Sequence, residues 1–177
     1  IDYIIHCASI TSSMDIVSRP VETIDISVNG TLNVLRFAQS KAVKSMVYLS
    51  SMEVFGVTDG QKKVGESDYG YIDILNTRSS YPESKRICEC LCHSYAKEYS
   101  LPVKNVRLAQ TLGAGIDYDD TRVAAQFARA VIENHDIVLK TLGATKRPVI
   151  YTSDAISAVL IVLLKGVDGQ SYTAANE

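Results

Sequence analysis

The chain has 177 residues, a formal net charge of −2, 46% hydrophobic residues and 21% charged residues. This balance is typical of a single globular domain and argues against a disordered chain. The small net charge excludes the basic footprint of a general nucleic-acid binder, and no apolar run is long enough for a membrane span or a signal peptide, so we expect neither nucleic acid nor membrane as a partner.

The first half of the chain alternates strand-like apolar runs with a helical pattern. Residues 1–8 are predicted to form a buried strand, and residues 46–49 a second strand that ends at two serines. Between these strands, Pro20 marks the first turn of a helix, where a missing N–H costs nothing. Residues 56–80 are polar and lack periodicity, and we interpret them as a long loop of the kind that is usually functional.

The second half continues the alternation. The predicted helices span residues 82–99, 121–134 and 154–164. The predicted strands span residues 103–108, 137–139, 149–151 and 171–175. Strands that alternate with helices predict an α/β fold with a doubly wound, mainly parallel sheet covered on both faces.

Two of these helices carry more detailed expectations. In the helix over 121–134, the apolar spacing predicts that four residues face inward, namely Val123, Phe127, Val131 and Ile132. The helix over 154–164 is expected to be capped by Ser153 or Asp154, whose side-chain oxygens can accept hydrogen bonds from free N–H groups.

The strongest chemical signal is Tyr81 followed four residues later by Lys85. On a helix these side chains share a face, and a nearby ammonium is expected to lower the pKa of the phenol and make it a usable general base. A bare Tyr-x-x-x-Lys is more often a surface pair. The context favours chemistry, because Ser51 is expected at the carboxyl end of a strand, where open α/β sheets bind ligands. A serine there is otherwise often a turn residue.

Ser51, Tyr81 and Lys85 together resemble the catalytic triad of the extended short-chain dehydrogenases/reductases, in their NAD-dependent sugar-nucleotide epimerase/dehydratase group. Further stretches that resemble this family in the same order are residues 5–9, 29–33, 50–56, 107–113 and 147–154. The resemblance implies a Rossmann-like fold, NAD as the cofactor and a nucleotide sugar as the substrate. The alternative is a non-catalytic relative that binds a dinucleotide for regulation or scaffolding, although such relatives typically lack the tyrosine or the lysine.

The resemblance also implies individual roles. Tyr81 removes the proton of the sugar 4-hydroxyl, Lys85 holds the nicotinamide ribose, and Ser51 orients the sugar oxygen, with Glu53 as a fourth catalytic candidate. The implied cofactor-binding residues are Cys7, Ala8, Ser9, Asn29, Ser50, Tyr81, Lys85 and Leu108. The implied substrate-binding residues are Gln110, Arg122 and Arg147.

Residues 52 and 53 bear on the reaction. A 4-keto sugar can be reduced on its other face, dehydrated or, when C6 is a carboxylate, decarboxylated. Met52 cannot protonate a leaving hydroxyl, and Glu53 differs from the small residues usual in simple 4-epimerases. Decarboxylation needs neither an adjacent acid nor a C5 base, so it ranks slightly above the others. UDP-glucuronate decarboxylases also resemble residues 70–73, 78–81 and 120–123.

The spacing of the four cysteines predicts neither a set of disulfides nor a metal site. Cys88, Cys90 and Cys92 lie within five residues, a poor disulfide pattern that favours a reduced, cytoplasmic compartment. On a helix Cys88 and Cys92 share a face while Cys90 points away, so we expect buried inert thiols rather than metal ligands.

The chain contains no G-x-G-x-x-G fingerprint, which in the family precedes the strand ending here at His6. We therefore expect an N-terminally truncated piece of a longer protein. Residues 1–110 would form the later half of the NAD-binding Rossmann domain. Residues 111–177 would combine part of a substrate-binding region with a returning Rossmann strand and helix. The family commonly pairs the helices near 20–40 and 82–99 with a second copy, so a homodimer is expected.

Overall fold

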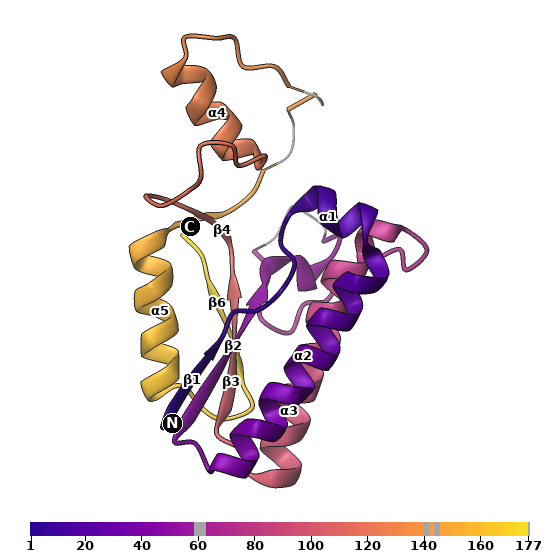
Figure 1. Cartoon of the computed structure of the whole chain (residues 1–177), viewed down its shortest axis with the longest axis vertical. Helices are drawn as coiled ribbons and strands as arrows, with labels where there is room; N and C mark the ends of the chain where they lie inside the picture. The colour runs from indigo at the N-terminus through magenta and orange to yellow at the C-terminus, as the bar shows by residue number, and fades with distance from the viewer. Residues whose placement is uncertain (59–62, 140–141, 144–145, 177) are drawn as a thin grey trace.

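A computed structural model describes residues 1–58, 63–139, 142–143 and 146–176. Its main sheet has four parallel strands. Its strands lie in the order β1-β2-β3-β6 (Figure 1). Their bounds are β1 (Tyr3–His6), β2 (Ser45–Ser51), β3 (Val103–Leu108) and β6 (Ser171–Ala174). Because these strands run in one direction, their carboxyl ends meet at the upper edge of the sheet in Figure 1.

Helices cover both faces of this sheet, which confirms the doubly wound arrangement. The long helices α2 (Pro20–Lys41) and α3 (Ser80–Tyr99) lie side by side on one face, and α5 (Thr152–Lys165) covers the other (Figure 1). The short helix α1 (Ser13–Ser18) leads into α2. Pro20 is the first residue of α2, as predicted. None of the described helices is long and apolar enough to cross a membrane.

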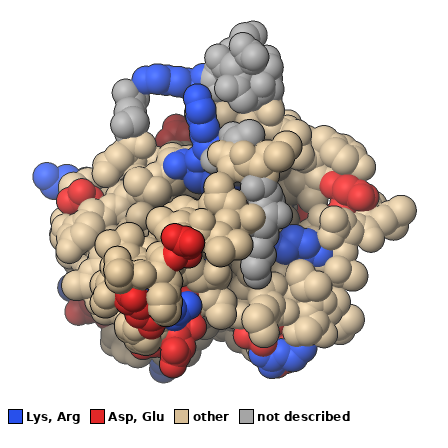
Figure 2. Space-filling view, turned by 90° about the horizontal axis from the view of Figure 1, so that it is seen from above, with Lys and Arg blue, Asp and Glu red and all other residues tan. Residues whose placement is uncertain are grey.

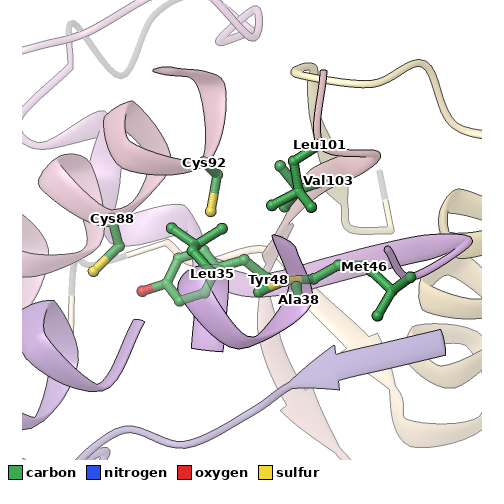
Figure 3. Close-up of a cluster of buried hydrophobic side chains, with 9 residues drawn as sticks. Leu35, Ala38, Met46, Tyr48, Cys88, Cys92, Leu101 and Val103 are labelled. Atoms are coloured by element: carbon green, nitrogen blue, oxygen red, sulfur yellow. The ribbon is translucent and has the colours of Figure 1, made fainter. Parts of the chain in front are cut away.

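The core has one layer on each side of the sheet. The layer under α2 and α3 (Figure 3) consists of Leu35, Ala38, Val43, Met46, Tyr48, Cys88, Cys92, Leu101 and Val103. The layer under α5 consists of Val47, Val106, Ala109, Ile150, Ala155, Val159, Val162, Leu163 and Ala174. Cys88 and Cys92 are fully buried and Cys90 is exposed, which confirms their predicted placement.

A smaller unit lies beyond the carboxyl edge of the sheet. Here β4 (Gln110–Leu112) pairs in parallel with β5 (Val149–Tyr151), and α4 (Val123–Ile132) stands above them (Figure 1). The inward placement of Val123, Val131 and Ile132 is wrong, since their side chains are 60–73% exposed. No residue of α4 is fully buried, because the described elements cover its apolar side only in part.

Two local predictions in this part of the chain are also wrong. Residues 137–139 form no strand and are exposed. Neither Ser153 nor Asp154 caps α5, because the helix begins earlier, at Thr152, directly after β5. The hydroxyl of Thr152 instead donates to the carbonyl of Leu112 at 3.0 Å, which ties the start of α5 to β4.

Candidate active site

The site begins where β2 ends. Ser51 is the last residue of β2, and its Oγ accepts a hydrogen bond from the backbone N–H of Glu53 at 3.2 Å. This bond caps the 3₁₀ turn η1 (Met52–Phe55) that follows. Ser51 and Glu53 therefore lie at the carboxyl edge of the sheet, where the sequence placed them.

The first turn of α3 brings the tyrosine and the lysine to the same edge. Tyr81 is 9% exposed and Lys85 is 3% exposed, so both are buried on one face of the helix. The Nζ atom of Lys85 donates to the carbonyl of Leu49 on β2 at 2.8 Å. It lies 5.6 Å from the centre of the Tyr81 ring. The shared face predicted from their spacing is confirmed.

The predicted effect of Lys85 on Tyr81 is wrong. Burial raises the pKa of Tyr81, and the charge of Glu53 adds to that rise. A hydrogen bond with the Ser51 hydroxyl and the charge of Arg78 act in the opposite direction. The ammonium of Lys85 is directed to the carbonyl of Leu49 instead, so Ser51 and Arg78 are the groups that favour the tyrosinate.

Arg78 is a site residue that the sequence reasoning did not single out. Its Nη2 donates to Oε1 of Glu53 at 2.8 Å, and its guanidinium carbon lies 5.7 Å from the centre of the Tyr81 ring. Both partners of this ion pair remain about one-third exposed. The one feature of the sequence that could have indicated Arg78 is its position three residues before Tyr81.

Arg86 fixes the relative positions of the segments that form the site. From α3, its Nε donates to the carbonyl of Val54 and its Nη2 to the carbonyl of Gly70, both at 2.8 Å. Gly70 could not be replaced without strain, because an added Cβ would lie 1.9 Å from the carbonyl oxygen of Val57. The 3₁₀ turn after Ser51 and the loop around Gly70 are thus bonded to the helix that carries Tyr81.

The carboxyl end of β1 supplies the segment implied for the cofactor. Cys7 and Ala8 are exposed there, and the Oγ of Ser9 lies 3.4 Å from the Oγ of Ser27 on α2. Ser50 is buried next to Ser51, and its hydroxyl has no partner among the described residues. Leu108 ends β3 beside them.

Asn29 is the cofactor candidate that the structure does not bring to the site. It lies exposed on α2, where its Nδ2 donates to Oδ1 of Asp25 at 2.6 Å. Ser27, two residues earlier, is 1% exposed and faces the site, with its carbonyl accepting from the thiol of Cys88. A shift of two residues along a helix turns a side chain to the opposite side.

The three substrate candidates belong to the smaller unit. Gln110 begins β4 opposite Val149. Arg122 precedes α4, and its Nε donates to Oδ2 of Asp120 at 2.8 Å. Arg147 is exposed just before β5. The described residues contain no group of three or more His, Cys, Asp or Glu side chains that could hold a metal ion.

We expect that replacing Lys85 with methionine stabilises the fold while it removes activity. Burial lowers the pKa of Lys85 from 10.5 to about 8, so keeping the ammonium buried costs free energy at pH 7. Lys85→Met is therefore expected to raise the free energy of unfolding by about 1–3 kcal/mol. Below pH 8 this cost is fully present, and it declines as the pH rises toward 10.5.

Denaturant unfolding of the intact protein at pH 7 and at pH 10 measures the effect. Lys97→Met is the matched control, because Lys97 is an exposed lysine near the end of the same helix. A loss of stability in Lys85→Met at pH 7 contradicts the prediction.

The comparison with known families assigns the chain. The profile described as "NAD dependent epimerase/dehydratase family" matches residues 1–176. The chain belongs to this family, in agreement with the resemblance carried by Ser51, Tyr81 and Lys85.

Individual relatives agree with this assignment. UDP-glucuronic acid decarboxylase 1 of Danio rerio is 27% identical over 164 residues, which are 92% of this chain and 38% of the relative. UDP-glucuronic acid decarboxylase 3 of Arabidopsis thaliana is 30% identical over 168 residues, which are 95% of this chain and 48% of the relative. The chain therefore spans less than half the length of these relatives.

Solved structures share the fold. A UDP-N-acetylglucosamine 4-epimerase from Methanobrevibacter ruminantium, in complex with UDP-N-acetylmuramic acid, matches with a TM-score of 0.88 and 20% identity, over 98% of this chain and 55% of that one. A dTDP-glucose 4,6-dehydratase from Streptomyces venezuelae, solved with NAD, gives a TM-score of 0.85 and 22% identity, over 98% of this chain and 52% of that one. The Rossmann-like fold is thereby confirmed.

Proposed function

We propose that the intact protein oxidises a nucleotide sugar at C4 with NAD and then converts the 4-keto sugar. The observation that carries this proposal is the buried pair of Tyr81 and Lys85 beside Ser51 at the carboxyl edge of a parallel sheet. A structural role alone would not explain a buried ammonium, because its desolvation costs free energy.

The residues present fit an NAD molecule. An ammonium has three donors, and among the described residues Lys85 uses one of them, on Leu49. The others can hold ribose hydroxyls, and the buried hydroxyl of Ser50 and the exposed residues Cys7 and Ala8 lie at the same edge. NAD⁺, when bound, would supply the group that accepts the hydride from C4 of the sugar.

The protein's own groups handle protons and orientation. Ser51 holds the sugar 4-oxygen toward Tyr81, and Tyr81 takes the proton of that hydroxyl as a general base. Arg122 and Arg147 would bind the pyrophosphate of the nucleotide, together with Gln110 near the sugar. Figure 2 looks onto this end of the molecule and shows basic and acidic side chains interspersed on a mostly uncharged surface. Individual arginines, rather than a broad basic patch, would therefore hold the substrate.

Among the possible conversions we rank decarboxylation of UDP-glucuronate slightly first, ahead of dehydration and 4-epimerisation. Met52 offers no acid for loss of water, whereas a 4-keto uronic acid loses CO₂ by passing its electrons to the neighbouring ketone. Arg78 supports an anionic substrate, because its Nη1 is buried beside Tyr81 without a partner among the described residues. The relatives named as UDP-glucuronic acid decarboxylases support the same ranking.

Incubation of the intact protein with NAD⁺ and UDP-glucuronate tests this ranking. We expect release of CO₂ and formation of a pentose nucleotide, measured by gas analysis and chromatography. Interconversion of 4-epimers of a UDP-hexose, with UDP-glucuronate left untouched, would show that the ranking is wrong. That result would leave the assignment of Ser51, Tyr81 and Lys85 intact.

A cytoplasmic homodimer remains part of the proposal. Ile24 and Phe37 on α2 and Ile87 on α3 are exposed apolar side chains that a second copy could cover. The non-catalytic alternative is disfavoured by the presence of both Tyr81 and Lys85.

A further inference from the structure

Lys85 lies between two aromatic rings. Its Nζ is 4.8 Å from the centre of the Tyr48 ring and 5.6 Å from the centre of the Tyr81 ring. A cation over the face of an aromatic ring is attracted by the ring quadrupole, most strongly where water is excluded. Both Lys85 and Tyr48 are at most 3% exposed, so water does not screen this contact.

The ring of Tyr48, rather than its hydroxyl, makes the contact with the site. Tyr48 lies in the middle of β2 and packs under α2 and α3 (Figure 3). Its Oη atom is buried without a hydrogen-bond partner among the described residues. The ammonium of Lys85 donates to the carbonyl of Leu49 rather than to this hydroxyl, so the ring accounts for what this position contributes to Lys85.

We propose that Tyr48 is a positioning residue for Lys85, whose ring face holds the ammonium charged and directed toward the carboxyl edge of the sheet. The inference rests on the proposed function in one respect, since it assumes that a charged Lys85 is the form that holds the cofactor. Burial alone would drive Lys85 toward the neutral amine. The ring offsets part of that effect, in addition to the charge of Glu89, which also favours the ammonium.

Several other groups surround the ammonium. The titratable groups that face Lys85 are His6 and Cys7 from β1 and its end, Tyr48 from β2, and Tyr81, Cys88 and Glu89 from α3. Burial lowers the pKa of His6, and the charge of Lys85 lowers it further, so the imidazole stays neutral near pH 7. Its Nε2 lies 3.1 Å from the hydroxyl of Thr31, and its ring lies 5.6 Å from that of Tyr48. Among these groups Lys85 is the cation, and the carboxylate of Glu89 is paired with Arg107.

The test is a direct titration of Lys85 in the intact protein. Lysine labelled with ¹³C at Cε gives an NMR signal for each lysine, and the spectrum of Lys85→Met identifies the signal of Lys85. In Tyr48→Leu we expect the pKa of Lys85 to fall from about 8 to about 7, because a cation–π contact is lost; one pKa unit corresponds to about 1.4 kcal/mol. In Tyr48→Phe the ring face remains, and the pKa is expected to stay near 8.

A matched control separates the ring from the packing. Tyr95→Leu removes a tyrosine ring from the same core layer, remote from Lys85, and is expected to leave the titration of Lys85 where it was. If Tyr48→Leu does not fold, a trifluorinated phenylalanine in place of Tyr48 keeps the volume but weakens the quadrupole, and it is expected to lower the pKa in the same direction. A pKa of Lys85 that stays at 8 or rises in Tyr48→Leu, or in the trifluorinated variant where Tyr48→Leu does not fold, would overturn the inference.

The titration also separates this inference from the proposed function. It requires no turnover, so a shifted Lys85 signal in a protein that converts no nucleotide sugar would support the role of Tyr48 while contradicting the reaction. Normal turnover of a nucleotide sugar with an unchanged Lys85 titration would support the reaction and contradict the role of Tyr48.

Discussion

Replacement of Tyr81 by phenylalanine is expected to reduce turnover of the intact protein by about 10²–10⁴-fold. Phenylalanine keeps the ring that packs at the start of α3 and removes only the phenol, so folding should be preserved. The lost factor is that of a general base, because the remaining hydroxyl, on Ser51, is bonded to the backbone of Glu53 and is a far weaker base. Steady-state kinetics with saturating NAD⁺ and nucleotide sugar measure the effect.

The control for this change is on the same helix. Tyr99 is the last residue of α3 and is half exposed, so Tyr99→Phe removes a phenol far from the site. It is expected to turn over at the normal rate. Near-normal turnover of Tyr81→Phe would remove Tyr81 from the role of base, whereas loss of activity in both variants would indicate a damaged helix.

Much of the fold followed from local pattern. The strands over 103–108 and 149–151 match the structure residue for residue. Residues 149–151 are a short apolar run, whereas residues 103–108 mix apolar with polar side chains and follow Pro102, which marks their start. The helix predicted over 82–99 begins two residues earlier in the structure, at Ser80. Buried parallel strands and amphipathic helices carry strong sequence signals, since each must hide an apolar face.

The failures occur where the structure depends on distant partners. The spacing in α4 predicted a buried side, yet the described part of the chain places nothing over Val131 and Ile132. The short motif over residues 29–33 points to Asn29, yet Asn29 lies on the outer surface of α2. Ser27, two residues earlier on the helix, faces the site instead. Periodicity shows which side of a helix is apolar but not whether another element covers it.

The candidate site was predictable to the extent that it follows strand ends and helix spacing. Ser51, Tyr81 and Lys85 come together for those reasons. The contacts of Arg78 with Glu53 and of Tyr48 with Lys85 cross between segments 25 and 37 residues apart, and no local pattern encodes them. The raised pKa of Tyr81 likewise follows from burial, which spacing does not report.

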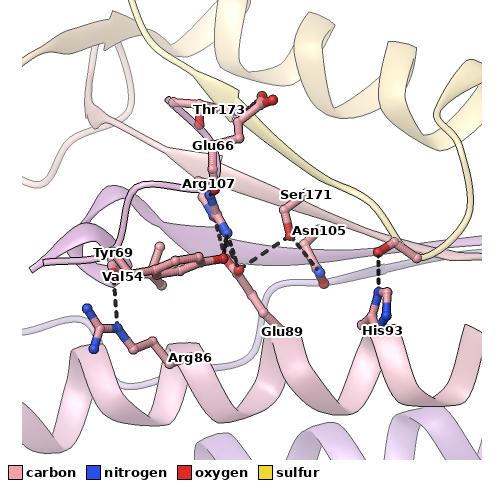
Figure 4. Close-up of polar contacts among 11 residues, drawn as sticks. Val54, Glu66, Tyr69, Arg86, Glu89, His93, Asn105, Arg107, Ser171 and Thr173 are labelled. Carbon is pink, nitrogen blue, oxygen red and sulfur yellow. Dashed lines mark hydrogen bonds and ion pairs between the residues drawn. The ribbon is translucent and has the colours of Figure 1, made fainter. Parts of the chain in front are cut away.

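Loss of Arg107 is expected to be the most destabilising single change. Arg107 on β3 is 1% exposed, and its Nη2 lies 2.7 Å from Oε2 of Glu89, whose side chain is 7% exposed (Figure 4). Its Nη1 donates to the carbonyl of Glu66 at 2.6 Å, and it also bonds to the hydroxyl of Tyr69. One guanidinium therefore joins the sheet, α3 and the loop that leads to the site.

Arg107→Met should lower the free energy of unfolding by about 3–5 kcal/mol, the usual cost of breaking one side of a buried ion pair. The reason is that Glu89 would remain buried as an unpaired carboxylate, with Ser171 as its remaining hydrogen-bond donor among the described residues. Denaturant unfolding of the intact protein gives the value. Arg19→Met is the control, since Arg19, between α1 and α2, forms exposed ion pairs with Asp15 and Glu22, and its loss is expected to leave the midpoint unchanged.

A double variant identifies the cause of that loss. If the unpaired charge of Glu89 dominates, the combination of Arg107→Met with Glu89→Met should be more stable than Arg107→Met alone, because no carboxylate is then left buried. If the lost anchor of residues 66–69 dominates, the double variant should be no more stable than the single one. We expect the first outcome, because Glu89 accepts three of the hydrogen bonds that Arg107 donates, whereas Glu66 and Tyr69 each accept one.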